Sequence, residues 1–229
     1  MKKLKTLFVQ FENEIPPNLV AAFRGAIIEK VGRENVLFHQ HKGDEELFYH
    51  YPLIQYKSVG KKASIICLGD GVDEIHKLFE FKKWDITVHE EKILLKINRL
   101  DLNTITLNVW EKPFDYTLTN WIALNKQNFE KFLQNDSLAE KCNQLEKLIT
   151  ANILSFAKGV DWTIDKPITT TISNIKGQKT IRYKGVPLAA FDVEFKSNVF
   201  LPNFIGLGKS VSHGFGILRM NHKKENIDK

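Results

Sequence analysis

The chain has 229 residues, of which 43% are hydrophobic and 26% are charged, proportions typical of a soluble globular protein with one large or two small domains. Its net charge of +6 comes mainly from lysine and suits a polyanionic partner. Two cysteines exclude a cysteine metal site, and no apolar run is long enough to span a bilayer, so we expect a cytoplasmic protein that binds no membrane.

The first half of the sequence predicts the order strand, helix, strands, helix, strand. A helix is predicted after Pro16 and Pro17, because apolar residues then recur at i, i+4 spacing until Gly32 ends the pattern. The order is that of ferredoxin-like βαββαβ domains. The other predicted elements are strands over 4–11, 36–41, 48–59, 63–68, 86–88, 93–97 and 104–110, with a short helix over 72–79.

A change of pattern after residue 111 predicts two domains, 1–111 and 112–229. The second begins with two helical patterns, and Ser137 with Glu140 forms a capping box at the start of the longer one. Two strands over 168–175 and 179–184 are predicted to turn at 176–178, and a long strand over 187–200 follows.

A glycine-rich segment follows that long strand. It is not a nucleotide-binding P-loop, because Asn203 stands where the first glycine is required and later glycines prevent a helix. It is not a dinucleotide fingerprint, because Val211 stands at the third glycine position. A glycine-rich turn without a ligand is the alternative to an anion-binding loop. Two Gly-x-Gly pairs flank a basic and small-residue stretch: Gly206, Gly208, Lys209, Ser210, Gly214 and Gly216.

This segment resembles the C-terminal glycine-rich motif of the CRISPR repeat-processing endoribonucleases of the RAMP superfamily. The resemblance implies an α+β fold of two tandem ferredoxin-like halves, the second degenerate, ending in a glycine-rich loop. It also implies repeat RNA as the partner, no cofactor, and RNA contacts from the six residues just named. Other CRISPR effector subunits and a second copy of the chain are further candidate partners.

His39 and His41 form the pattern with the clearest chemistry. If they lie on a strand, both face the same side at about 6.6 Å along it. Two imidazoles can then flank one phosphate, one accepting the proton of a ribose 2′-OH and the other protonating the leaving 5′-oxygen. The products would be a 2′,3′-cyclic phosphate and a 5′-hydroxyl, with no metal needed.

The resemblance extends to this region, because one branch of the family carries a His-x-His pair followed by a tyrosine-rich strand. It implies catalytic roles for His39, His41 and Tyr49, and for Lys30 as a group that stabilises charge on the phosphate.

Other interpretations of the pair remain open. His-x-His is also a metal-binding pattern, with His50, Asp44 or Glu45 as a third ligand. Both rings could face solvent without a role, or only the second histidine could be active. His213, within the glycine segment, could contact phosphate or make a local turn contact.

Further RNA contacts are expected from basic and aromatic residues. Tyr51 could stack on a base, with burial in the core as the alternative. The predicted hairpin could grip phosphates, with a charged, solvated edge as the alternative. The residues assigned to these contacts are Lys42, Tyr51, Lys179 and Arg182.

The sequence therefore predicts a metal-independent endoribonuclease that cuts CRISPR repeat RNA. One alternative is a RAMP-type RNA-binding subunit without activity, and another is a metal-dependent hydrolase that uses the same histidines.

Overall fold

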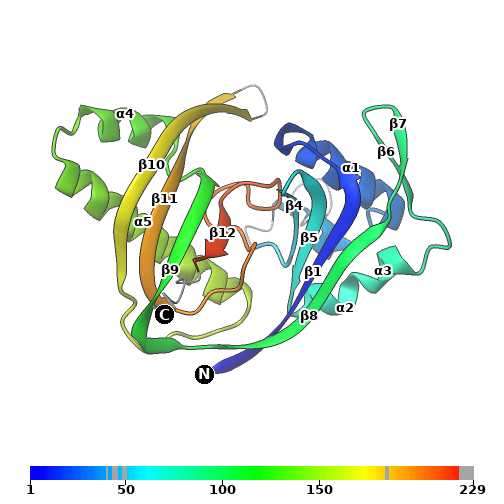
Figure 1. Ribbon diagram of the computed structural model, residues 1–229, viewed down its shortest axis with the longest axis horizontal. Coiled ribbons are helices and arrows are strands. Elements are labelled where there is room, and N and C mark those ends of the chain that lie inside the picture. Colours follow the sequence, from blue (N-terminus) through cyan, green and yellow to red (C-terminus); the bar gives the residue numbers. More distant parts are fainter. Residues whose placement is uncertain (40, 43–45, 48–50, 184–185, 222–229) are drawn as a thin grey trace, which may run out of the picture.

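The computed structural model describes residues 1–39, 41–42, 46–47, 51–183 and 186–221 (Figure 1). The N-terminal part contains β1 (Lys2–Glu14), η1 (Pro17–Leu19), α1 (Val20–Val31), η2 (Val36–Phe38), β2 (His41–Lys42), β3 (Glu46–Leu47), β4 (Ile54–Val59), β5 (Lys62–Leu68), α2 (Asp70–Glu74), α3 (His76–Phe79), β6 (Asp85–Val88), β7 (Glu91–Leu94) and β8 (Ile97–Leu107). The C-terminal part contains β9 (Val109–Trp121), α4 (Lys126–Gln134), α5 (Leu138–Gly159), β10 (Thr170–Tyr183), β11 (Val186–Val199) and β12 (Ile217–Met220).

Both parts have the ferredoxin-like strand order. The first sheet runs β4-β5-β1-β8 and the second runs β10-β11-β9-β12, with antiparallel neighbours throughout. In the second part the glycine-rich segment stands between β11 and β12, where the first part has α2 and α3. The predicted fold, with a degenerate second half, is confirmed.

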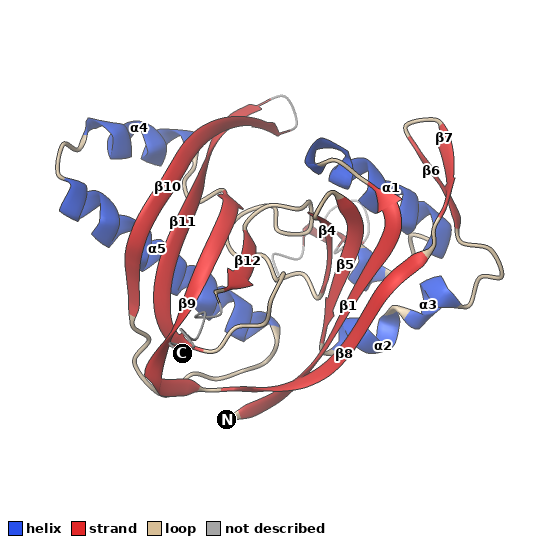
Figure 2. Ribbon diagram, viewed as in Figure 1, coloured by secondary structure: helices blue, strands red, loops and turns tan. Residues whose placement is uncertain are grey.

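The sheets face each other, and the helices lie on their outer sides (Figure 2). The glycine-rich segment lies between the sheets, and β12 is an edge strand of the second sheet (Figure 1). The chain passes from the first sheet to the second at Asn108, the one residue between β8 and β9. The predicted boundary at residues 111 and 112 therefore lies within β9.

The apolar core continues across the two parts. One buried cluster joins Phe8, Ile66 and Leu68 of the first sheet to Leu201 and Leu207 of the C-terminal part. The rings of Phe8 and Phe204 stack at 4.5 Å between centroids. A second cluster fills the space between the first sheet and its own helices. Apolar packing therefore fixes one sheet relative to the other.

Local signals account for the start of α5 and the end of α1. The Ser137 hydroxyl accepts a hydrogen bond from the Glu140 amide at 3.3 Å, which confirms half of the predicted capping box. Gly32, with φ +94°, ends α1 as predicted. Among the described helices, none combines the length and the apolar character needed to cross a membrane.

Two predicted features are wrong. The predicted strand over 36–41 is a 3-10 turn followed by the two-residue strand β2. The predicted hairpin turn at 176–178 is instead part of the continuous strand β10, which is bulged beside Gly177. Of the strand predicted over 48–59, residues 54–59 form β4, and residues 48–50 lie outside the described part.

Candidate functional site

The glycine-rich loop, residues 206–216, is closely packed at its glycines. A Cβ on Gly216 would lie 1.8 Å from the Leu207 carbonyl oxygen, and the residue has φ +61°. A Cβ on Gly208, with φ +95°, would lie 2.6 Å from the Trp121 indole. Gly206 also leaves no room for a side chain, and Gly214 has φ +90° with a tight fit against Val20. These glycines are therefore required by the fold of the loop itself, and their predicted contact with RNA remains a separate prediction.

The N-terminal part holds this loop through β4 and the residues before it. The Tyr51 hydroxyl donates to the Gly206 carbonyl at 2.7 Å, and the Gln55 side-chain oxygen accepts from the Gly206 amide at 2.8 Å. Lys57 Nζ donates to the Val211 carbonyl at 2.7 Å. The backbone of Tyr56 also pairs with that of His213 as a parallel bridge. The loop therefore depends on contacts with residues about 150 positions earlier in the chain.

Lys57 is fully buried, with 0% of its surface exposed. Its Nζ also lies 3.4 Å from the Phe215 carbonyl oxygen. Within the described part of the chain, no carboxylate forms an ion pair with it. Burial disfavours the charged form and lowers the pKa of Lys57 to about 7.

The free energy of unfolding is expected to rise with pH between about 7 and 9 because of Lys57. In this window the unfolded lysine, with a pKa of about 10.4, binds a proton that the native lysine has released. Stability increases with pH wherever the unfolded state binds more protons. Urea titrations across this window should detect the increase, and the Lys57→Met variant should lack it. An equal increase in that variant would assign the effect to another group.

His39 follows η2 and is tied to its surroundings on both sides. Its ring Nε2 lies 2.6 Å from the Arg33 carbonyl oxygen, and because a carbonyl only accepts, Nε2 carries the proton. The Arg24 guanidinium donates to the His39 carbonyl at 2.8 Å. The backbone of His39, with φ −135° and ψ −13°, is not that of a strand residue. The predicted shared strand face of His39 and His41 is therefore wrong, since His39 ends the 3-10 turn η2 and does not belong to a strand.

The stretch that carries the two histidines, residues 38–41, is called the histidine segment, and it connects to the glycine-rich loop through Tyr56. The Tyr56 hydroxyl donates to the Phe38 carbonyl at 3.2 Å, and its backbone pairs with His213 of the loop. The start of α1 also touches the loop, because a Cβ on Gly214 would lie 3.0 Å from Val20. The fold thus brings residues 38–39, α1 and the loop into one neighbourhood.

Several predicted residues lie in the sparsely described segment between η2 and β4. For His41 and Lys42 the structure describes only the backbone, which pairs with Leu47 and Glu46 in β2 and β3. Tyr49 lies outside the described residues. So do Asp44, Glu45 and His50, the metal ligands considered for the pair. No group of three His, Cys, Asp or Glu in the described ranges is placed to hold a metal ion.

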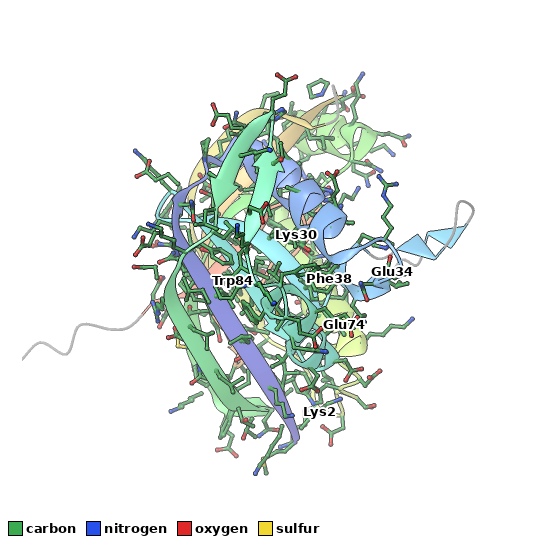
Figure 3. All side chains as sticks on the ribbon, turned by 90° about the vertical axis from the view of Figure 1, so that its right-hand side faces the viewer. Lys2, Lys30, Glu34, Phe38, Glu74 and Trp84 are labelled. Carbon is green, nitrogen blue, oxygen red and sulfur yellow. The ribbon has the colours of Figure 1, made fainter. Side chains whose placement is uncertain are left out.

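Lys30 lies at the end of α1 and is engaged with the β6–β7 hairpin. Its Nζ contacts an Asp85 carboxylate oxygen at 2.8 Å and stands 5.1 Å from the centre of the Phe81 ring. The hydrogen bond from Lys30 lowers the pKa of Asp85. Figure 3 shows Lys30 on the outer side of the N-terminal part. Its predicted phosphate contact would require it to leave this ion pair.

Arg24 is a cation of this neighbourhood that the sequence analysis did not select. It lies on α1, and its guanidinium reaches the His39 carbonyl. Its charge is also close enough to Tyr56 to act on the pKa of that phenol, which burial raises. Arg24 stands two turns before Val31 on the half-buried side of the helix. The sequence alone does not reveal that this side faces the segment around His39.

The remaining predicted RNA contacts differ in exposure. Tyr51 is 9% exposed and its ring packs against Phe156, so it is not presented to a base, and the alternative of a core position holds. Lys209 is exposed, and Ser210 is half-buried with φ +56°. The His213 ring lies 3.2 Å from the Ser212 hydroxyl, a local contact of the kind considered as the alternative.

The basic residues of β10 are partly neutralised by β11. Lys179 pairs with Asp192 at 3.0 Å and Lys176 with Glu194 at 2.6 Å. For Arg182 the structure describes only the backbone, in β10. The charged-edge alternative fits Lys176 and Lys179 as they stand.

Family models match both parts of the chain. The model of the Cas6b N-terminal domain matches residues 2–106, and that of the Cas6b C-terminal domain matches residues 108–221. An uncharacterized protein of Methanocaldococcus jannaschii is 34% identical over 99 residues, which are 43% of this chain. The match spans 66% of the length of that curated relative.

Two solved structures resemble the whole molecule. A crystal structure of Cas6b has a TM-score of 0.84 at 24% identity, and one of the CRISPR RNA processing endoribonuclease Cas6b has a TM-score of 0.73 at 23% identity. Each comparison covers 96% of this chain and 100% of the other. At these identities the likeness is one of fold.

Proposed function

The chain belongs to the Cas6b family, and from this premise we propose that it is an endoribonuclease that cuts CRISPR repeat RNA into guide units. The observation that carries the proposal is that family models cover both domains, one with the histidine segment and one with the glycine-rich loop. The similar solved structure described as a CRISPR RNA processing endoribonuclease supports the same reaction class.

The proposed reaction uses the nucleophile of the RNA itself. A base removes the proton of a ribose 2′-OH, the oxygen attacks the adjacent phosphorus, and the bond to the 5′-oxygen breaks as an acid protonates it. The products carry a 2′,3′-cyclic phosphate and a 5′-hydroxyl. Imidazole groups have pKa values that suit both steps near neutral pH, so the scheme needs no metal ion.

We assign the acid–base chemistry to His39 and His41. Support comes from the hydrogen bonds that connect residues 38–39 to Tyr56 and from there to the loop at His213. Because Nε2 of His39 donates to Arg33, its neutral ring carries the lone pair on Nδ1, the atom that would take or give the proton. Tyr49 and Lys30 remain predicted contributors to the same step.

RNA binding is assigned to the loop and to nearby basic residues. Exposed Lys209, with the loop backbone around it, would contact phosphates, as would Lys42 and Arg182. A role for Lys179 requires RNA to compete with Asp192. Association with other CRISPR effector subunits or with a second copy of the chain remains a prediction.

The products and the metal requirement provide the test. Purified protein incubated with repeat RNA from its own CRISPR array should cut at one position in excess EDTA as fast as without it. Mass spectrometry of the upstream fragment should detect the 2′,3′-cyclic phosphate. Cleavage that stops in EDTA and returns with Mg²⁺ would favour the metal-dependent hydrolase. Tight binding without any cleavage would favour the non-catalytic RNA-binding subunit.

A further inference from the structure

The interior of the domain interface contains a lysine to which the proposed chemistry assigns no part. Lys57 lies on β4, and its side chain is fully buried. A lysine side chain is almost never fully buried, because its amine must give up water. Such a buried amine must be held by hydrogen-bond acceptors around it, and its acceptors indicate what it does.

The contacts of Lys57 all lead to one element. Its Nζ donates to the Val211 carbonyl at 2.7 Å and lies 3.4 Å from that of Phe215, so it joins two points of the loop that are four residues apart. A Cβ on Gly206 would stand 2.8 Å from the same Nζ. A glycine at 206 therefore leaves the space through which the amine reaches the loop.

The direction of the two carbonyls has a geometric consequence. Because both carbonyl oxygens point to one amine, the backbone of residues 211–215 is held in a turn against β4. The adjacent Tyr56–His213 bridge fixes the same stretch from the backbone side. Without the amine, the Val211 carbonyl would keep only the longer contact from the Gly214 amide, at 3.4 Å, and the Phe215 carbonyl would lose its link to β4.

We infer that Lys57 is a positioning residue that presets the glycine-rich loop in the shape that receives RNA. This deepens the proposed function, on which its RNA-binding part rests. Lys57 is too deeply buried to touch RNA itself, so its effect is transmitted through the loop. A loop ordered before binding avoids the loss of conformational freedom that ordering on binding would require.

The test uses Lys57→Met, which keeps the length of the side chain and removes the donor. Hydrogen exchange of residues 206–216 should become faster in the absence of RNA, because the loop loses the donor that ties it to β4. The Kd for repeat RNA with a 2′-deoxy group at the scissile nucleotide should increase about tenfold. The single-turnover rate at saturating natural RNA should change much less, because the histidine segment is left in place.

Lys92→Met is the matched control, since it makes the same substitution at an exposed position on the β6–β7 hairpin. Equal exchange in the loop and equal Kd for Lys57→Met and Lys92→Met would overturn the inference. If Lys57→Met fails to fold, Lys57→Leu, which also removes the donor, decides by the same two measurements, and wild-type values in both would overturn it. Hydrogen exchange of the loop is measured without RNA. If the wild-type protein fails to cleave repeat RNA, the proposed function is rejected, and the exchange rates still decide whether Lys57 presets the loop.

Discussion

His41→Ala is expected to lower the single-turnover rate of repeat-RNA cleavage by roughly 10²–10⁴-fold, the contribution typical of a general acid or base. The reason is that the imidazole either removes the 2′-OH proton or protonates the leaving oxygen, and alanine does neither. Binding of the RNA should change little, because phosphate contacts come from other residues. Quenched-flow or gel assays at saturating protein measure the rate, and a filter-binding assay measures the Kd.

His76→Ala serves as the matched control. The His76 ring lies on α3 in contact with Asp73 and Glu80, outside the neighbourhood of the loop, so its removal should leave cleavage unchanged. A double His39→Ala, His41→Ala variant that still cuts at the wild-type rate would show that the acid–base assignment is incorrect.

Gly216→Ala is expected to destabilise the protein by about 3 kcal/mol or more, because it combines backbone strain with overpacking. The added Cβ would stand 1.8 Å from the Leu207 carbonyl oxygen, a backbone atom that cannot rotate away, and the residue needs φ +61°. Urea denaturation followed by circular dichroism measures the change. RNA binding should weaken as well, since the loop must shift to admit the methyl group.

Gly177→Ala is the control for this variant. Gly177 lies in the bulged part of β10 with no atom within 4 Å of an added Cβ, so its free energy of unfolding should change by less than about 0.5 kcal/mol. Similar losses in the free energy of unfolding at the two positions would contradict the close packing around Gly216.

The order of strands and helices in the first half was predictable from the sequence, because apolar runs such as residues 63–68 indicate strands and the resulting order is that of ferredoxin-like domains. The prediction failed where the runs were short. Val36, Leu37 and Phe38 are as apolar as a strand, and three residues cannot distinguish a strand from a turn that buries one ring. Gly177 between two polar residues indicated a hairpin, although an isolated glycine in a strand is equally a sign of a bulge.

The glycine-rich loop was also found in the sequence, but its support was not. Lys57 sits in an alternating strand pattern in which a lysine normally indicates the solvent-exposed face. Its burial depends on Val211 and Phe215, more than 150 residues away, and no local pattern contains that information. Lys30 was predicted to contact phosphate, and its position at the end of α1 did not reveal that Asp85 would pair with it.

The single residue Asn108 between β8 and β9 limits what the molecule can do when it meets its ligand. With so short a connection and a shared apolar interior, we expect the two halves to keep their spacing when RNA binds. The RNA would then have to bend, unstack or unpair to fit. Discrimination between RNAs would then reflect how easily each one deforms, in addition to any base that is read directly.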